Sequence, residues 1–218
     1  MRIVNQIHLI EYITPDPLQV IERAARTCYK SEDQITKESA VELVRKLIAR
    51  GHEAMLEFAY LSVRFVTDRG VSHELVRHRL CSFAQESTRY CNYQKGDHME
   101  FIMPSWFTRI EVGEYDFQRI DVTDQAYIDN EGLWFAQMIW SEKTYNQLIK
   151  EKWSPQQARS VLPNSLKTEI VVSANFREWR HILKLRCSKS AHPQMRQLML
   201  PLLADLNDLC PEIFAGLL

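Results

Sequence analysis

Apolar residues recur at helical spacing in the first fifty residues and at alternating spacing soon afterwards. Residues 18–29 carry an apolar face of helical period, and a second such face runs from 41 to 48 and ends near Gly51. Residues 59–66, AYLSVRFV, alternate between apolar and polar side chains, which predicts a half-buried strand. Together with a first strand near the N-terminus, these elements predict a chain that mixes helices with a sheet.

The second half of the chain continues this mixture. Ser154, Pro155 and Gln157 form a capping-box arrangement, which predicts that a short helix begins there. The other predicted elements are a short helix over 71–79, a strand near 101–103, a long helix over 123–151, a strand over 167–174, a helix over 176–186 and a last helix after 190–193. This order predicts an α+β fold, in which a small, mostly antiparallel sheet packs with several helices in a single domain over 1–218.

The overall charge of the chain is close to neutral. The formal net charge is -1 over 218 residues, of which 25% are charged and 45% hydrophobic. Proteins that bind nucleic acid or anionic membranes usually carry a strong basic surface, so neither partner is expected here. Any anion site must therefore be local.

The cysteines are five in number, widely spaced and without a CxxC pair. This arrangement suits neither a disulfide framework nor a structural zinc site, and the sequence predicts no metal site. A reducing cytosol is the simplest compartment, so a cytoplasmic location is expected. The N-terminal segment is similar to neither a secretory signal nor a membrane span, and no membrane association is expected.

A basic triplet, Arg77, His78 and Arg79, follows the predicted short helix. Consecutive helical residues point about 100° apart, so the three side chains would serve different ligands or different faces of an assembly. A solvated helix end that complements the helix dipole is the alternative interpretation.

Residues 81–90, CSFAQESTRY, combine hydroxyl side chains with Gln85 and Arg89, and their composition predicts a turn-like stretch. Hydroxyls, backbone N–H groups and a guanidinium fork together suit a phosphate, with Arg89 as the clamp. An ordinary polar surface has a similar composition. Cys81 lies three residues after His78, which raises a thiolate–imidazolium nucleophile, but a buried cysteine that acts as a small hydrophobe is the favoured interpretation.

The predicted helix over 176–186 places Arg186 on the same face as Trp179 and Leu183. A guanidinium on a core-facing stripe must be paired or ligand-bound, or must extend past the helix end to water. Arg159 lies in the first turns of the predicted helix at 154, where it either shares an anion site or is an ordinary exposed arginine.

The triplet and Ser87, seven residues further on, resemble the RHR-x7-S signature of the flavin-dependent thymidylate synthases, the ThyX family. Further segments are similar in the same order: RAAR at 23–26, GHEAMLEF at 51–58, ARSVLPNSL at 158–166, NFREW at 175–179, LKLR at 183–186 and HPQMR at 192–196. The resemblance covers nearly the whole chain.

The resemblance implies a methyltransferase that converts dUMP to dTMP. It implies 5,10-methylenetetrahydrofolate as carbon donor, reduced FAD as hydride source and NADPH as the reductant of the flavin. It also implies a homotetramer with active sites at subunit interfaces and no cysteine nucleophile, so that Cys81 is expected to be a bystander.

The resemblance also implies roles for individual positions. Arg186 would activate the uracil ring, and Arg159 would reach dUMP from another chain. The residues implied for FAD are Ala54, Arg77, His78, Arg79, Gln85, Asn175, Phe176, Arg177 and His181. The residues implied for dUMP are Glu74, Leu75, Val76, Arg77, Gln85, Glu86, Ser87, Thr88, Arg89, Arg159 and Arg186.

Three positions depart from the commoner pattern of the family. Ala54 stands where a small hydroxyl residue is usual, His181 stands where asparagine is usual, and Ala84 replaces a polar residue. Two other functional classes are alternatives: a nucleotide-binding regulatory module without chemistry, and an RNA-binding protein that stacks bases on Phe83, Tyr90 and Tyr93. The retained Arg186 argues against the first class, and the near-neutral charge argues against the second.

Overall fold

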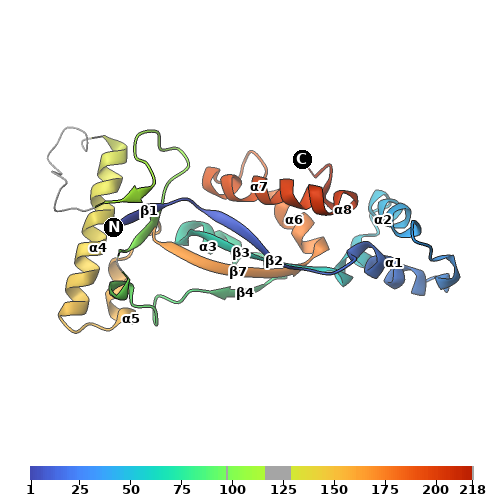
Figure 1. The fold of residues 1–218 in the computed structure, drawn as a ribbon, viewed down its shortest axis with the longest axis horizontal. Helices are drawn as coiled ribbons and strands as arrows, with labels where there is room; N and C mark the ends of the chain where they lie inside the picture. The colour runs from blue at the N-terminus through green and yellow to red at the C-terminus, as the bar shows by residue number, and fades with distance from the viewer. Residues whose placement is uncertain (97, 116–128, 218) are drawn as a thin grey trace. The chain divides into compact units, whose positions relative to one another are not determined.

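The computed structural model describes residues 1–96, 98–115 and 129–217 (Figure 1). Its elements are β1 (Arg2–Val4), β2 (Ile7–Ile13), α1 (Pro17–Thr27), η1 (Glu32–Gln34), α2 (Ser39–Ala49), η2 (Glu53–Phe58), β3 (Tyr60–Asp68), α3 (Arg69–Leu75), β4 (Ser82–Gln85), η3 (Tyr93–Lys95), β5 (Glu100–Ile102), β6 (Gly113–Glu114), α4 (Asn130–Lys150), α5 (Pro155–Ala158), η6 (Arg159–Val161), β7 (Lys167–Asn175), α6 (Phe176–Arg186), α7 (Pro193–Leu209) and α8 (Pro211–Phe214). The predicted α+β class is confirmed. Within the described residues, no helix is long and apolar enough to span a bilayer.

The described chain divides into two compact units. Unit 1 comprises residues 1–7, 66–75 and 85–170, and unit 2 comprises residues 8–65, 76–84 and 171–218. Strands β3 and β7 each run from one unit into the other. The single domain over 1–218 stays a prediction.

The larger sheet has the strand order β2-β3-β7-β4. In unit 2, Ser62 of β3 donates to Ser173 of β7 at 2.8 Å, and the backbone N–H of Phe176 donates to the carbonyl of Ala59. These partners advance in opposite directions along the two strands, which is antiparallel pairing, as predicted. Side chains along β7 alternate strictly between buried and partly exposed, as a strand with one face on a core requires.

The core of unit 2 lies beneath α6. Trp179, Ile182 and Leu183 are fully buried on one face of this helix, and the Trp179 indole Nε1 donates to the carbonyl of Leu61 at 2.9 Å. Helices α7 and α8 pack against α6, and α7 adds a run of buried residues from Met195 to Leu206. This packing fixes the rotation of α6, and hence the direction in which its polar face points.

Unit 1 contains a smaller three-stranded sheet with the order β5-β1-β6. Its core gathers Ile3, Phe101, Phe135 and Tyr145, so that the long helix α4 covers the strands. Strand β1 pairs parallel to β5 and antiparallel to β6. The sequence did not predict this second sheet or its parallel pair, because strands of two or three residues are too short to show a period.

Several predicted boundaries change in the structure. The short helix predicted over 71–79 is wrong at its end, because α3 stops at Leu75 and the basic triplet lies in a turn. The stretch predicted as turn-like from residue 81 begins instead as strand β4, which pairs with β7. The helix predicted over 123–151 is confirmed as α4 from Asn130, and its first residues, 123–128, lie outside the described residues. The capping box at Ser154 is confirmed.

Candidate active site

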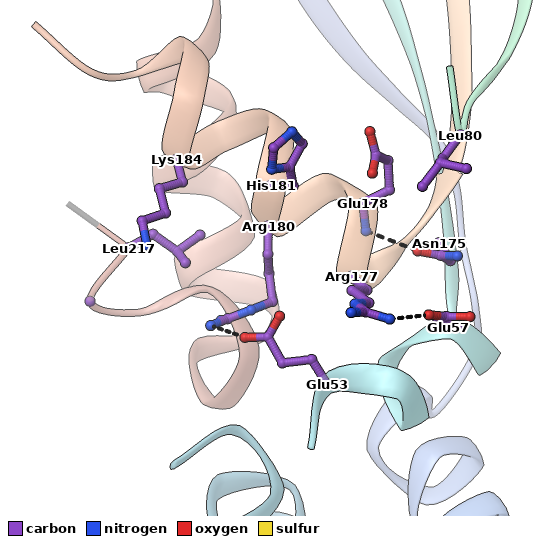
Figure 2. Close-up of a pocket in the computed structure, with 11 residues that line it drawn as sticks. Glu53, Glu57, Leu80, Asn175, Arg177, Glu178, Arg180, His181, Lys184 and Leu217 are labelled. Atoms are coloured by element: carbon purple, nitrogen blue, oxygen red, sulfur yellow. Dashed lines mark hydrogen bonds and ion pairs between the residues drawn. The ribbon is translucent and has the colours of Figure 1, made fainter. Parts of the chain in front are cut away.

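The junction of β7 and α6 sets the geometry of the first candidate site, in unit 2. Asn175 ends the strand and caps the helix, since its side-chain oxygen accepts a hydrogen bond from the backbone N–H of Glu178 at 2.9 Å. The buried stripe of α6 then directs the opposite face of the helix into a pocket of about 770 Å³ (Figure 2). This volume is typical of ligand and cofactor sites.

Charged side chains line this pocket in pairs. Arg177 contacts Glu57 at 2.6 Å, and Arg180 contacts Glu53 at 3.1 Å, so two bases of α6 face two acids of η2 (Figure 2). Arg180 also donates to the carbonyl of Ile213. The Arg177 pair is about half exposed, whereas the Arg180 side chain is largely buried. Of these two arginines, Arg177 is therefore the one that a ligand can reach.

A chain of polar contacts runs from Arg186 through His78 to Glu178, which lines this pocket together with His181. The Arg186 Nε donates to His78 Nε2 at 2.9 Å, and His78 Nδ1 lies 3.7 Å from Glu178 Oε1. The His78 and His181 rings meet edge to face, with centroids 6.0 Å apart. Burial, the Arg186 charge and His181 together lower the pKa of His78 to about 4. His78 is therefore neutral at pH 7, with a lone pair on Nε2 for Arg186.

We expect this buried neutral histidine to make folding sensitive to acid. The unfolded chain takes up a proton near pH 6.5, whereas folded His78 takes one up only near pH 4, so stability falls as the pH drops between these values. The slope is at most about 1.4 kcal/mol per pH unit from this one group. Urea unfolding of the wild type and of His78→Gln at several pH values measures it, and equal slopes for the two proteins would contradict the assignment.

The donor atoms of His78, Glu178 and His181 lie within 4.8 Å of one another, a spacing that could hold a metal ion. Arg186 donates to His78 Nε2, so the ring proton of neutral His78 resides on Nδ1, which is the nitrogen nearer Glu178. Neither ring nitrogen of His78 is then available to an ion. The absence of a metal site stays a prediction.

Cys81 shares this environment but is not activated by it. Burial, assisted by the negative charge of Glu178, raises the pKa of its thiol to about 12. A thiol with this pKa stays protonated at neutral pH and is a poor nucleophile. The favoured interpretation of the sequence, a cysteine without a catalytic role, agrees with this environment.

The second candidate site is the segment after β4, in unit 1. Gln85 donates to the hydroxyls of Ser72 and Thr168 at 2.9 and 3.3 Å, which fixes its amide. Glu86 accepts a hydrogen bond of 2.6 Å from the Tyr93 hydroxyl. Burial and this carboxylate raise the pKa of Tyr93, which stays a donor at all ordinary pH values.

The residues that follow bring two guanidinium groups to one loop. The Arg159 Nη1 donates to the Thr88 hydroxyl at 3.3 Å, and the Ser87 hydroxyl accepts from the backbone N–H of Arg89 at 3.3 Å. Arg89 is exposed and lies over the ring of Tyr90 at 5.4 Å. Two hydroxyls with two arginines form a donor set that suits a phosphate. The Arg159 contact lies within one chain, and its predicted reach into another chain stays a prediction.

The other predicted site residues differ in accessibility. Arg77, Arg79 and Ala54 are exposed in unit 2, whereas His78 is buried, so the triplet does point in divergent directions. Phe176 is fully buried against Phe214, which leaves no exposed side chain for a flavin. Of the residues named for the nucleotide, Leu75 is buried at the end of α3, Glu74 is partly buried beside it, and Val76 is exposed.

Sequence reasoning missed the acidic and hydroxyl partners of these residues. Ser72 lies 13 residues from the side chain it contacts, and Glu53, Glu57 and Thr168 lie at least 83 residues from theirs, so no local pattern reveals these partners. The position of Glu178 in the first turn of a helix could have been predicted, because an asparagine followed three residues later by a glutamate is typical of a helix start.

Comparisons with known proteins bear on both sites. Residues 8–212 match the family model Thy1, described as thymidylate synthase complementing protein. A flavin-dependent thymidylate synthase of Corynebacterium aurimucosum is 34% identical over 199 residues, which cover 89% of this chain and 78% of the relative. The enzyme of that name from Geobacter sulfurreducens is 30% identical over 216 residues, with coverages of 96% and 85%.

Two solved structures share the fold. Thymidylate synthase X of Helicobacter pylori, solved with FAD and dUMP, superposes with a TM-score of 0.76 at 22% identity, over 97% of this chain and 98% of that one. The UMP/dUMP methylase PolB of Streptomyces cacaoi, bound to 5-Br dUMP, gives 0.76 at 20% identity, over 98% and 95%. The family match spans both units and both candidate sites, and the chain belongs to the flavin-dependent thymidylate synthase (Thy1) family.

Proposed function

We propose that this methyltransferase converts dUMP to dTMP. In the proposed reaction, 5,10-methylenetetrahydrofolate donates the carbon, reduced FAD supplies the hydride, and NADPH reduces the flavin. Family membership makes the chain an enzyme of the methyltransferase class, and the proteins named above are called flavin-dependent thymidylate synthases or a UMP/dUMP methylase, which supports the proposal. The observation that carries the proposal furthest is the Arg186 guanidinium at the end of α6, which donates to neutral His78.

Arg186 is proposed as the catalytic residue. A guanidinium at the N3 and O4 edge of uracil stabilises the negative charge that develops when C5 of the ring becomes nucleophilic. Because the Nε–H group is already engaged by His78, the plane of the guanidinium is set before substrate arrives. The reaction needs no thiolate, which suits the protonated Cys81.

The dUMP phosphate is assigned to the loop of unit 1, where Ser87, Thr88, Arg89 and Arg159 supply hydroxyl and guanidinium donors. Gln85 and Glu86, both fixed by hydrogen bonds, complete the nucleotide set, together with Glu74, Leu75, Val76 and Arg77. A variant of this chain in which both Arg89 and Arg159 are replaced by alanine should lose affinity for dUMP but keep its bound flavin.

FAD is assigned to the pocket on α6. The residues present fit it, because the pocket is large enough for part of a dinucleotide and offers Arg177, Asn175 and His181 as polar contacts. Ala54, Arg77, His78, Arg79, Gln85 and Phe176 are the other proposed contacts, with Phe176 restricted to its backbone because its side chain is buried. The flavin, when bound, supplies the hydride.

We further propose that the chain acts as a homotetramer whose active sites lie at subunit interfaces, that it resides in the cytoplasm, and that it forms one domain. Arg77 and Arg79 are exposed whereas His78 is buried, so the three side chains of one chain point in different directions, which supports a ligand site shared between chains.

A flavin spectrum tests the proposed function. The purified protein should be yellow, its absorption should shift on titration with dUMP, and it should form dTMP when NADPH and methylenetetrahydrofolate are present. A colourless protein that takes up no FAD, and that forms no dTMP when FAD is added, would defeat the proposal. Binding of dUMP without any dTMP formation would instead indicate a nucleotide-binding module.

Cys81→Ala should keep the rate of dTMP formation of the wild type to within about two-fold, because a thiol held protonated near pKa 12 takes no part in the chemistry. Steady-state turnover measures this effect. Complete loss of turnover in a variant with normal circular dichroism would revive the nucleophile hypothesis.

A further inference from the structure

The side chain of Glu178 has no established role, yet it lies almost buried at the edge of the candidate active site. It is 9% exposed and projects from α6 on the same side as His181 (Figure 2). Its nearest basic atom among the described residues is His78 Nδ1, at 3.7 Å, and a buried carboxylate is costly unless it interacts with a partner. Burial of Glu178 therefore needs an explanation beyond packing.

The tautomer of His78 supplies one. Arg186 Nε–H is a donor only, so His78 Nε2 must be the acceptor in the 2.9 Å contact between them. A neutral imidazole with an acceptor at Nε2 carries its proton on Nδ1. The opposite tautomer would set two N–H groups against each other, and an imidazolium would do the same and add a repulsive charge.

Glu178 lies on the side of the ring where that proton must reside. The negative carboxylate, 3.7 Å from Nδ1, stabilises the Nδ1–H tautomer by direct attraction. Its backbone is fixed at the third helical position by the Asn175 cap, at 2.9 Å, so the carboxylate has a defined place.

We propose that Glu178 is a positioning residue, which orients the Arg186 guanidinium by holding His78 in the tautomer that accepts its hydrogen bond. The proposal rests on the proposed role of Arg186 for its effect on turnover, but the effect on the tautomer is independent of that role. The arrangement of the Glu178 carboxylate, the His78 imidazole and the Arg186 guanidinium is similar to that of a catalytic triad, in which the carboxylate fixes the tautomer of the histidine.

The test is Glu178→Gln, which keeps the size of the side chain and removes its charge. An amide can offer N–H to His78 Nδ1 and so stabilise the wrong tautomer. We expect kcat for dTMP formation to fall at least about ten-fold, while KM for dUMP and the flavin content stay within about three-fold. Glu178→Asp, which restores the charge, should recover part of the lost kcat.

A second readout needs no activity. Nitrogen-15 NMR of ring-labelled histidine should show His78 with a protonated Nδ1 and an unprotonated Nε2 in the wild type, and a changed ratio in Glu178→Gln. Glu212→Gln is the matched control, because it neutralises an acid in the first turn of another helix of unit 2 and should change neither readout.

An unchanged tautomer together with wild-type kcat in Glu178→Gln would overturn the proposal. A fall in thermal stability with kcat unchanged would also overturn it, because Glu178 would then be structural only. Failure of the proposed function would look different: no flavin and no dTMP in the wild type, with the tautomer shift between wild type and variant still measurable.

Discussion

Arg186→Ala is expected to lower dTMP formation by about 100- to 1,000-fold, while the fold and the flavin content stay close to those of the wild type. Removal of one donor aimed at developing charge typically has this effect on kcat. The buried residues of α6, including Trp179 and Leu183, hold the helix without Arg186, so the loss should reflect chemistry rather than unfolding. Single-turnover oxidation of reduced flavin, with dUMP and folate present, measures the step directly.

The same variant has a second expected signature. Burial is the main cause of the low pKa of His78 and the Arg186 charge is the second, so this pKa should rise above about 4 in Arg186→Ala but stay below 6.5. Proton NMR titration of the histidine rings measures it. Lys189→Ala is the control, since it removes an exposed positive charge just beyond α6 and should change neither the rate nor this pKa. Full turnover in Arg186→Ala would refute the catalytic assignment.

Trp179→Ala should destabilise the protein by about 3 to 5 kcal/mol. Trp179 is fully buried, packs against Phe65 with ring centroids 6.3 Å apart, and donates to the Leu61 carbonyl. Its loss leaves a cavity under α6 and an unsatisfied carbonyl on β3. Urea unfolding followed by circular dichroism measures the free energy of unfolding.

Two companion variants sharpen this prediction. Trp179→Phe keeps most of the apolar volume but loses the donor, so it should cost less than the alanine variant. Tyr29→Ala removes an aromatic side chain that is 78% exposed and should change the free energy of unfolding by no more than about 0.5 kcal/mol. Equal stability of Trp179→Ala and the wild type would show that α6 is held by other contacts.

Most long elements were predictable because their periods are local. The strand β7 and the helix α6 lie where β-branched alternation and an apolar stripe predict them, and the capping box at Ser154 starts α5 as expected. The short strands β1, β5 and β6 exist only through their pairing, so their register could not be read from a few residues. The end of α3 at Leu75 was mispredicted, since helical propensity continues through the triplet while His78 turns inward.

The candidate site, like the fold, was predictable from the sequence only in part. The residue types of the RHR triplet, the loop from Gln85 to Arg89, and Arg186 on the apolar stripe follow from the sequence, because spacing and side-chain chemistry are local properties. Only the tertiary structure joined Arg186 to His78, 108 positions apart, and set Glu178 at the other ring nitrogen. Burial and neighbouring charges exist only in the folded chain, so only the fold decided that the pKa of His78 is lowered and the pKa of the Cys81 thiol is raised.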